Sequence, residues 1–156
     1  SPGTKRVMVF SSIVTIQFVF GAFVAGLDAG LTHNTFPKMG RNWIPDGMFE
    51  LLLTVPFSSM VTTQFLHRVF GFSLLFYGIY FLVSKLNKFN FMQKKSIRIM
   101  SIAVFMQFCL GVATLLMYVP VSIASMHQVM GCVLLILLTR VIYFTLTCKK
   151  IIDQTE

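Results

Sequence analysis

The chain has 156 residues, of which 56% are apolar and 12% are charged, and its mean hydropathy is +0.79. A soluble domain has about 45–50% apolar and about 25% charged residues, so this chain has too few polar side chains to cover a water-soluble globule. The composition excludes a cytosolic α/β enzyme, a disordered chain and a secreted disulfide scaffold. It predicts a membrane protein with a few spans.

Four apolar segments are long enough to cross a bilayer, which takes about 20 residues of helix. We expect the spans at about 7–27, 60–84, 99–118 and 122–148. Pro56 lies either in the first turn of the second span or in a turn before it, and Pro120 predicts a turn between the last two. A lipid-exposed backbone must satisfy its own hydrogen bonds. We therefore expect an all-α, polytopic four-helix bundle that forms a single domain over residues 1–156.

The net charge of +8 belongs mostly to one end of this bundle. Nine basic residues flank the spans at that end: Lys5, Arg6, Lys85, Lys88, Lys94, Lys95, Arg98, Lys149 and Lys150. By the positive-inside rule this end faces the matrix or the cytoplasm. Connection 28–59 and the turn at Pro120 then lie on the positive side. The basic excess indicates topology, and we expect no nucleic-acid partner.

Connection 28–59 is long for a helical bundle, in which linkers usually have about 2–8 residues. It contains FPKMG and WIPDG, whose prolines and glycines favour turns, and it carries Phe36, Trp43 and Phe49. Two interpretations stay open: the loop caps a site, or its aromatic side chains anchor the protein at the membrane interface.

Two short patterns recur along the chain. QFVFG at 17–21 returns as QFCLG at 107–111, and HRVFG at 67–71 returns as HQVMG at 127–131. Because spans one and three run in the same direction, as do spans two and four, the patterns predict a parallel internal two-helix repeat.

The repeat places four glycines in one layer, about 20–27 Å from the basic end at 1.5 Å per residue. They are Gly21, Gly71, Gly111 and Gly131. His67 and His127 lie about one turn farther along. A histidine inside the membrane is rare and indicates a functional site. A flat macrocycle needs two axial ligands and helices without bulk against its faces, so the pattern favours a haem iron bound by His67 and His127, with the glycines providing clearance.

Other interpretations of these residues remain. The two histidines could form a structural hydrogen-bonded pair or a proton relay. Arg68 could pair with a haem propionate or extend to the lipid headgroups. We expect most of the glutamines in the spans, Gln17, Gln64, Gln107 and Gln128, to hydrogen-bond between helices.

The remaining metal-binding residue types give no second site. We expect His33 to be a solvated loop residue. Cys109 and Cys132 are single residues within spans, and we expect them to be small apolar core residues. A zinc or bare iron site would need more ligands at the level of the histidines.

Three stretches of the chain resemble the C-terminal half of the haem A synthase family, of the mitochondrial and alphaproteobacterial type. They are GAFVAGLDAGLTHNTFPKMGRNWIPD at 21–46, QFLHRVFG at 64–71 and GVATLLMYVPVSIASMHQVMG at 111–131. The resemblance implies an enzyme of two four-helix halves that oxidises the C8 methyl group of haem O to the formyl group of haem A for cytochrome c oxidase assembly. It also implies that His67 and His127 bind a haem b that passes electrons.

The family pattern puts the catalytic Glu and a Cys pair in the other half, so we expect no catalytic residue in this one. Because the chain begins with Ser, we expect an incomplete sequence, the alternative being a half-size member that acts as an oligomer. Expected partners are the bilayer, the missing half or a second copy, a redox donor such as a ferredoxin, and a supplier of haem O.

We expect the chain in the mitochondrial inner membrane or, alternatively, in a bacterial plasma membrane. Two other functions remain open. One is a non-catalytic bis-His membrane cytochrome that transfers electrons, and the other is a haem-free assembly protein.

Overall fold

The fold consists only of helices and their connections over the part of the chain that the computed structural model describes, residues 2–55 and 57–153. The elements are α1 (Pro2–Gly26), the short 3-10 helix η1 (Ala29–Leu31), α2 (Met48–Thr54), α3 (Met60–Val83), α4 (Phe91–Leu116) and α5 (Val121–Asp153). Four segments are long and apolar enough to cross a membrane: Gly3–Gly26, Met60–Val83, Phe91–Leu116 and Val121–Thr147. The predictions of an all-α fold and of four spans are confirmed.

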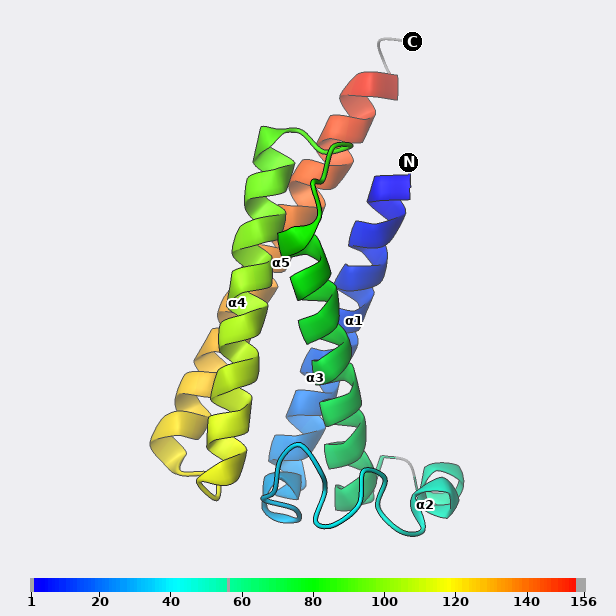
Figure 1. The fold of residues 1–156 in the computed structure, drawn as a ribbon, viewed down its shortest axis with the longest axis vertical. Coiled ribbons are helices and arrows are strands. Elements are labelled where there is room, and N and C mark those ends of the chain that lie inside the picture. The colour runs from blue at the N-terminus through cyan, green and yellow to red at the C-terminus, as the bar shows by residue number, and fades with distance from the viewer. Residues whose placement is uncertain (1, 56, 154–156) are drawn as a thin grey trace.

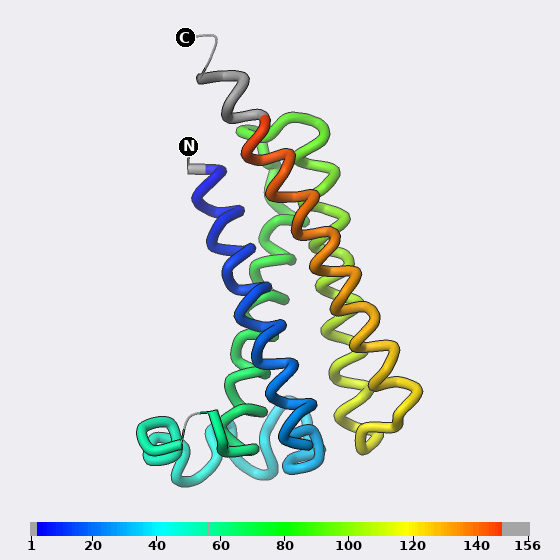
Figure 2. The backbone as a smooth tube through the Cα atoms, turned by 180° about the vertical axis from the view of Figure 1, so that it is seen from behind, coloured from blue at the N-terminus to red at the C-terminus, as the bar shows by residue number. Residues whose placement is uncertain are grey.

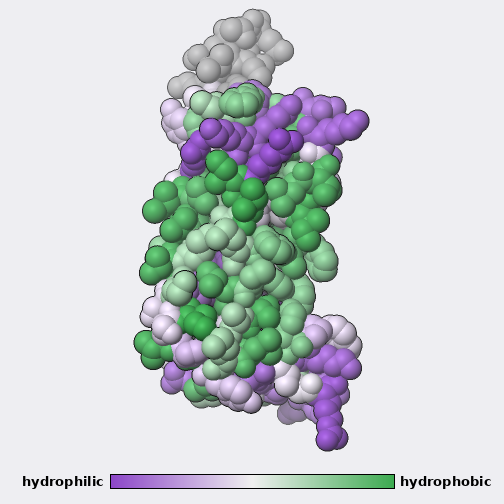
Figure 3. Space-filling view, turned by 60° about the vertical axis from the view of Figure 1, so that its left-hand side comes forward, coloured by the Kyte–Doolittle hydropathy of each residue, from purple (hydrophilic) through white to green (hydrophobic). Residues whose placement is uncertain are grey.

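The four long helices form a closed ring (Figure 1). α1 packs on α3, α3 on α4, α4 on α5, and α5 on α1, so that α1 and α4 lie diagonally, as do α3 and α5. The N-terminal half of α1 and the C-terminal half of α5 lie at the same end of the bundle (Figure 2). A broad apolar band separates two hydrophilic ends (Figure 3), as a bilayer requires.

The buried core occupies the end of the bundle where α1 begins. Its members are Val7, Phe10, Val14, Leu74, Phe81, Leu86, Phe89, Ile97, Met100, Ala103, Val104, Leu134, Leu138 and Val141. On each long helix these residues lie on the basic side of the layer that holds Gly21, Gly71, Gly111 and Gly131. The buried core therefore lies on the basic side of the glycines.

Local hydrogen bonds fix where the helices begin. The hydroxyl of Ser59 accepts from the main-chain N–H of Thr62 at the start of α3. At the start of α4, Asn90 and Gln93 form a reciprocal capping box. Because of this cap, α4 begins at Phe91, whereas the apolar span was expected from residue 99. α4 can begin before the apolar segment because its first turns, which carry Lys94 and Lys95, lie at the membrane interface.

The long connection between α1 and α3 has secondary structure of its own, which the sequence did not predict. It contains η1 and α2, and α2 is attached through Met48, which is 1% exposed. Gly47, just before α2, has φ = 71°, a left-handed conformation that glycine adopts without strain. The position of Pro56 lies outside the described residues.

Candidate functional site

A cavity of about 920 Å³ lies among the four long helices, with the four glycines in its wall and Val14, Leu74, Val104 and Leu134 lining it on the basic side of them. This volume is typical of sites that bind small molecules or cofactors, which have about 300–1,000 Å³. All four long helices and the loop after α1 contribute to its wall, which is mostly apolar. The sequence-predicted histidines, glycines and Arg68 all line it.

On the α1–α3 side, the imidazole of His67 lies between a glutamine and a glycine of α1. The amide nitrogen of Gln17 is 3.3 Å from Nε2 of His67. A Cβ atom on Gly21 would lie 3.3 Å from Cε1 of the same ring, closer than ordinary van der Waals contact. A Cβ on Gly71 would lie 3.4 Å from the amide nitrogen of Gln17. The two glycines therefore give room to the imidazole and to its glutamine.

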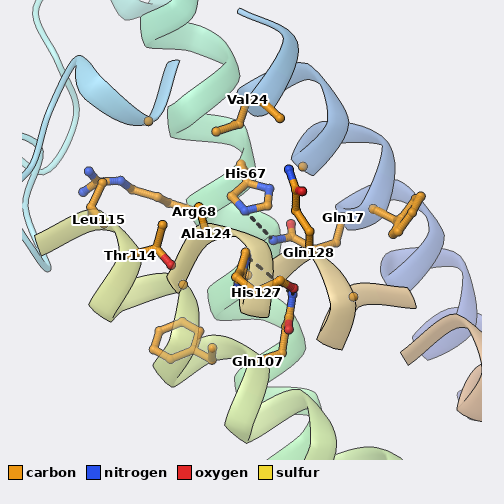
Figure 4. A pocket seen from close by; sticks show the side chains of 18 of the residues that line it. Gln17, Val24, His67, Arg68, Gln107, Thr114, Leu115, Ala124, His127 and Gln128 are labelled. Atoms are coloured by element: carbon orange, nitrogen blue, oxygen red, sulfur yellow. Dashed lines mark hydrogen bonds between the residues drawn. The ribbon is translucent and has the colours of Figure 1, made fainter. Parts of the chain in front are cut away.

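On the α4–α5 side, His127 has the same kinds of neighbours. The amide nitrogen of Gln107 is 3.4 Å from Nε2 of His127 and donates to the main-chain oxygen of that residue at 3.0 Å. A Cβ on Gly111 would lie 3.0 Å from Cε1 of the imidazole, and one on Gly131 would lie 3.5 Å from the amide of Gln107. Figure 4 shows both imidazoles beside their glutamines on the cavity.

Several polar atoms of these four side chains are buried without a partner. They are Nδ1 of His67, Nδ1 of His127, Oε1 of Gln17 and Oε1 of Gln107. Buried polar atoms are nearly always hydrogen-bonded, so a cluster of unpaired ones on a cavity wall calls for an explanation. Each ring thus has one nitrogen, Nε2, beside a glutamine amide and one buried nitrogen, Nδ1, without a partner.

Arg68 reaches from α3 to the loop after α1. Its Nη1 donates to the main-chain oxygens of Thr35 (2.8 Å) and Lys38 (3.2 Å), and its Nη2 donates to that of His33 (2.6 Å). Gln64, one turn earlier, donates to the same oxygen of His33 at 3.2 Å. The loop segment 33–38 is thus bound to α3 through its own backbone.

The aromatic residues of the loop divide between its two faces. Phe36 lines the cavity and contacts Phe72 of α3 and Phe108 of α4, with ring centroids 5.6 and 6.0 Å apart. Trp43 and Phe49 are 64% and 72% exposed. Each of the two interpretations of the loop thus agrees with the placement of some of its aromatic residues.

Comparison with known proteins identifies the family. The profile of the COX15-CtaA family, described as cytochrome oxidase assembly protein, matches residues 3–139. The chain belongs to this family. No solved structure matches the chain.

Curated members of the COX15-CtaA family are similar to most of this chain. "Heme A synthase" of Wolbachia sp. subsp. Brugia malayi (strain TRS) is 38% identical over 124 residues, which are 78% of this chain and 35% of the relative. "Heme A synthase COX15" of Homo sapiens is 38% identical over 122 residues (76% and 30%). "Heme A synthase" of Rickettsia bellii (strain OSU 85-389) is 39% identical over 136 residues (84% and 40%). The chain spans about a third of the length of these relatives.

The sequence did not predict which side chains would contact the imidazoles in this member of the COX15-CtaA family. Gln17 and Gln107 were expected to hydrogen-bond between helices, and they do so, to the histidines. The signal was present in the QFxxG patterns, because residues four apart share a helix face. Gln64 bonds to the loop instead, and Gln128 makes no hydrogen bond within the described part of the chain.

The expectation that Cys109 and Cys132 pack in the core was wrong. Both are exposed, and Cys132 lies along the cavity wall. A thiol is as compatible with lipid as an apolar side chain, so a membrane helix does not need to bury it. His33 is half-buried rather than fully solvated, with Nδ1 buried and without a partner.

Proposed function

We propose that this chain is the haem b-binding four-helix half of a haem A synthase, with His67 and His127 as the axial ligands of the iron. The observation that carries this proposal is the pair of His–Gln–Gly arrangements on one cavity. The family and the names of its members support haem A biosynthesis as the process.

The donor set fits a haem better than a bare metal ion. Two imidazoles on diagonal helices can supply two ligands, and a porphyrin brings the other four nitrogens with it. Among the described residues, no group of three or more His, Cys, Asp or Glu side chains could hold a metal ion. Zinc and non-haem iron need such a group.

The residues around each imidazole also fit a bulky flat ligand. Gly21 and Gly111 leave open the positions where a side chain would press on His67 and His127. The unpaired Nδ1 and Oε1 atoms are polar groups that a ligand or its water molecules can satisfy. The apolar wall excludes water from the rest of the cavity.

In this half the residues hold and orient a redox group. His67 and His127 would hold it, Gln17 and Gln107 contact the two rings, and the glycines leave room for the imidazoles and their glutamines. A haem held by two histidines would supply one-electron transfer. Within the family's reaction, oxidation of the C8 methyl group of haem O then takes place in the other half or in a second copy of the chain.

The proposed function also implies an electron donor, a supplier of haem O and a membrane in which the chain lies. The electron donor, such as a ferredoxin, and the supplier of haem O act from outside this bundle. The basic end faces the matrix of a mitochondrion or, alternatively, the cytoplasm of a bacterium. The cavity then lies near the positive side of the membrane.

Reduced-minus-oxidised spectra of the purified chain from haem-replete cells test the haem ligands. We expect an α-band in the unmodified protein, and its loss in His67→Ala and in His127→Ala. His33→Ala is the matched control and keeps the band, because its side chain lies in the loop. A haem-free assembly protein would show no band in any variant, and full haem content in both ligand variants would exclude these two residues as ligands.

A further inference from the structure

The guanidinium of Arg68 hydrogen-bonds to the loop after α1. Three of its N–H groups are used on the main-chain oxygens of His33, Thr35 and Lys38. These bonds are charge-assisted, and one fork holds three carbonyl groups from a stretch of six residues. A lysine could not reproduce this geometry, because its ammonium is a compact point charge.

Phe36 lies within the stretch that Arg68 binds. Its ring packs between Phe72 of α3 and Phe108 of α4, which contact each other with centroids 5.4 Å apart. All three rings line the cavity. Arg68 therefore fixes the backbone on both sides of Phe36, while the side chain of Phe36 contacts α3 and α4 at the cavity wall.

The corresponding position on α5 shows what Arg68 adds. In HRVFG and HQVMG, Arg68 and Gln128 each follow the histidine. α4 and α5 are joined by residues 117–120 alone, so the α4–α5 connection has no long loop of its own. Gln128 lies on the cavity beside His67 (Figure 4) and makes no hydrogen bond within the described residues. The arginine thus occurs on α3, the helix that the long loop precedes, and the glutamine occurs on α5, which follows a short turn.

We propose that Arg68 is a positioning residue that anchors loop 33–38, so that Phe36 forms one wall of the haem cavity. Arg68 acts through the loop rather than through contact with a propionate. Phe36 as a haem wall rests on the proposed function, whereas the anchoring of the loop by Arg68 does not.

Limited trypsin digestion of the purified, haem-free protein tests the anchor. Lys38 and Arg41 are exposed cleavage sites in or beside the anchored segment. Cleavage in a native protein follows the population of the open state, so Arg68→Gln and Arg68→Lys should each cut at these sites at least about tenfold faster. Arg98→Gln, on the exposed surface of α4 at the basic end, is the matched control and should cut at the unmodified rate. Equal rates in all four proteins overturn the anchor.

Arg68→Lys also separates the two roles of the arginine. It keeps the positive charge that a propionate needs but loses the fork that the loop needs. Protection that is lost in Arg68→Gln and fully kept in Arg68→Lys would contradict the anchor, because charge alone would then suffice. Thermal unfolding of each variant, recorded in the same detergent, identifies any preparation that has lost its fold.

Accessibility of the haem tests the wall in the holoprotein. Phe36→Ala and Arg68→Lys should both speed the reduction of the haem by dithionite by at least about threefold, because both would take the ring of Phe36 from the cavity wall and admit small reagents. Phe49→Ala, which removes an exposed ring of the same loop region, should leave this rate unchanged. An effect of Arg68→Lys without an effect of Phe36→Ala would overturn Phe36 as the wall. Absence of haem from the unmodified protein would instead overturn the proposed function and leave the trypsin result standing.

Discussion

Gly111 and His127 lie so close together that a side chain on the glycine would collide with the imidazole. A Cβ atom at position 111 would be 3.0 Å from Cε1 and 3.6 Å from both Nδ1 and Nε2 of His127. A distance of 3.0 Å is tighter than nine in ten real Cβ contacts, so the ring would have to shift by a few tenths of an ångström. The glycine and the histidine therefore form one unit, although they are on different helices.

Gly111→Ala should displace His127 and lower the haem content of the purified protein. Overpacking costs about 1–3 kcal/mol, and here the strain falls on a proposed ligand. Gly21→Ala, whose Cβ would lie 3.3 Å from His67, should have the same effect to a smaller degree. Haem per polypeptide, measured as the pyridine haemochrome, should be highest in the unmodified protein, lower in Gly21→Ala and lowest in Gly111→Ala.

Gly26→Ala is the matched control for these two variants, because nothing lies within 4 Å of its Cβ position. It should keep the full haem content and gain up to about 1 kcal/mol of helix stability. A Gly111→Ala protein that retains as much haem as Gly26→Ala would contradict the close packing of residue 111 on the ligand.

Gln107→Leu should weaken haem retention more than Gln17→Leu. Each glutamine holds an imidazole, and Gln107 also donates to the main-chain oxygen of His127. A hydrogen bond contributes about 0.5–1.5 kcal/mol net, so the second bond should add a factor of about 2–10 to the rate of haem loss. Transfer of haem to apomyoglobin measures the rates. Equal rates for the two variants, or faster loss from Gln17→Leu, would be evidence against this assignment of the bonds.

The sequence predicted the parts of this site that depend on position along a helix. The rise per residue places Gly21 and Gly111 in one layer and His67 and His127 about one turn farther along, and all four line one cavity. It did not predict rotation about the helix axis, which decides that Gly21 faces His67 while Gly71 faces Gln17. Rotation is set by packing among four helices, and no single span contains that information.

The loop shows a second limit of the sequence. Turn residues indicated where the chain bends between 28 and 59, but the contacts of Arg68 are to main-chain oxygens. Any residue has such an oxygen, so these partners leave no mark in the sequence. The sequence therefore left propionate binding and lipid contact as the open choices for Arg68, and a bond to the loop was not among them.

Ser59→Ala should destabilise the protein through the start of α3, the helix that carries His67. The hydroxyl of Ser59 accepts from the N–H of Thr62, and removal of such a cap costs about 0.5–2 kcal/mol. The measurement is thermal unfolding in detergent. Ser58→Ala, at the exposed neighbouring serine, is the control and should unfold at the unmodified temperature. Identical melting of the two variants would show that α3 does not depend on this cap.

Asn34→Asp should destabilise the end of the bundle opposite the basic end more than Asn34→Ala. The amide nitrogen of Asn34 donates to the main-chain oxygens of Gly30 and Leu115, both at 3.0 Å, and so ties the long loop to the last turn of α4. Alanine only removes these bonds, at about 0.5–1.5 kcal/mol each. Aspartate keeps the shape but puts a carboxylate, which accepts and cannot donate, against two carbonyl oxygens.

Thermal unfolding ranks the three proteins, and Asn87→Asp, in the exposed turn between α3 and α4, controls for the added charge. The expected order of unfolding temperature is unmodified, Asn34→Ala, Asn34→Asp, with Asn87→Asp beside the unmodified protein. The difference between the two substitutions at 34 should shrink as the pH falls toward about 4, because a protonated carboxyl group can donate again. An Asn34→Asp protein as stable as Asn34→Ala at neutral pH would mean that the amide does not bridge the loop and α4.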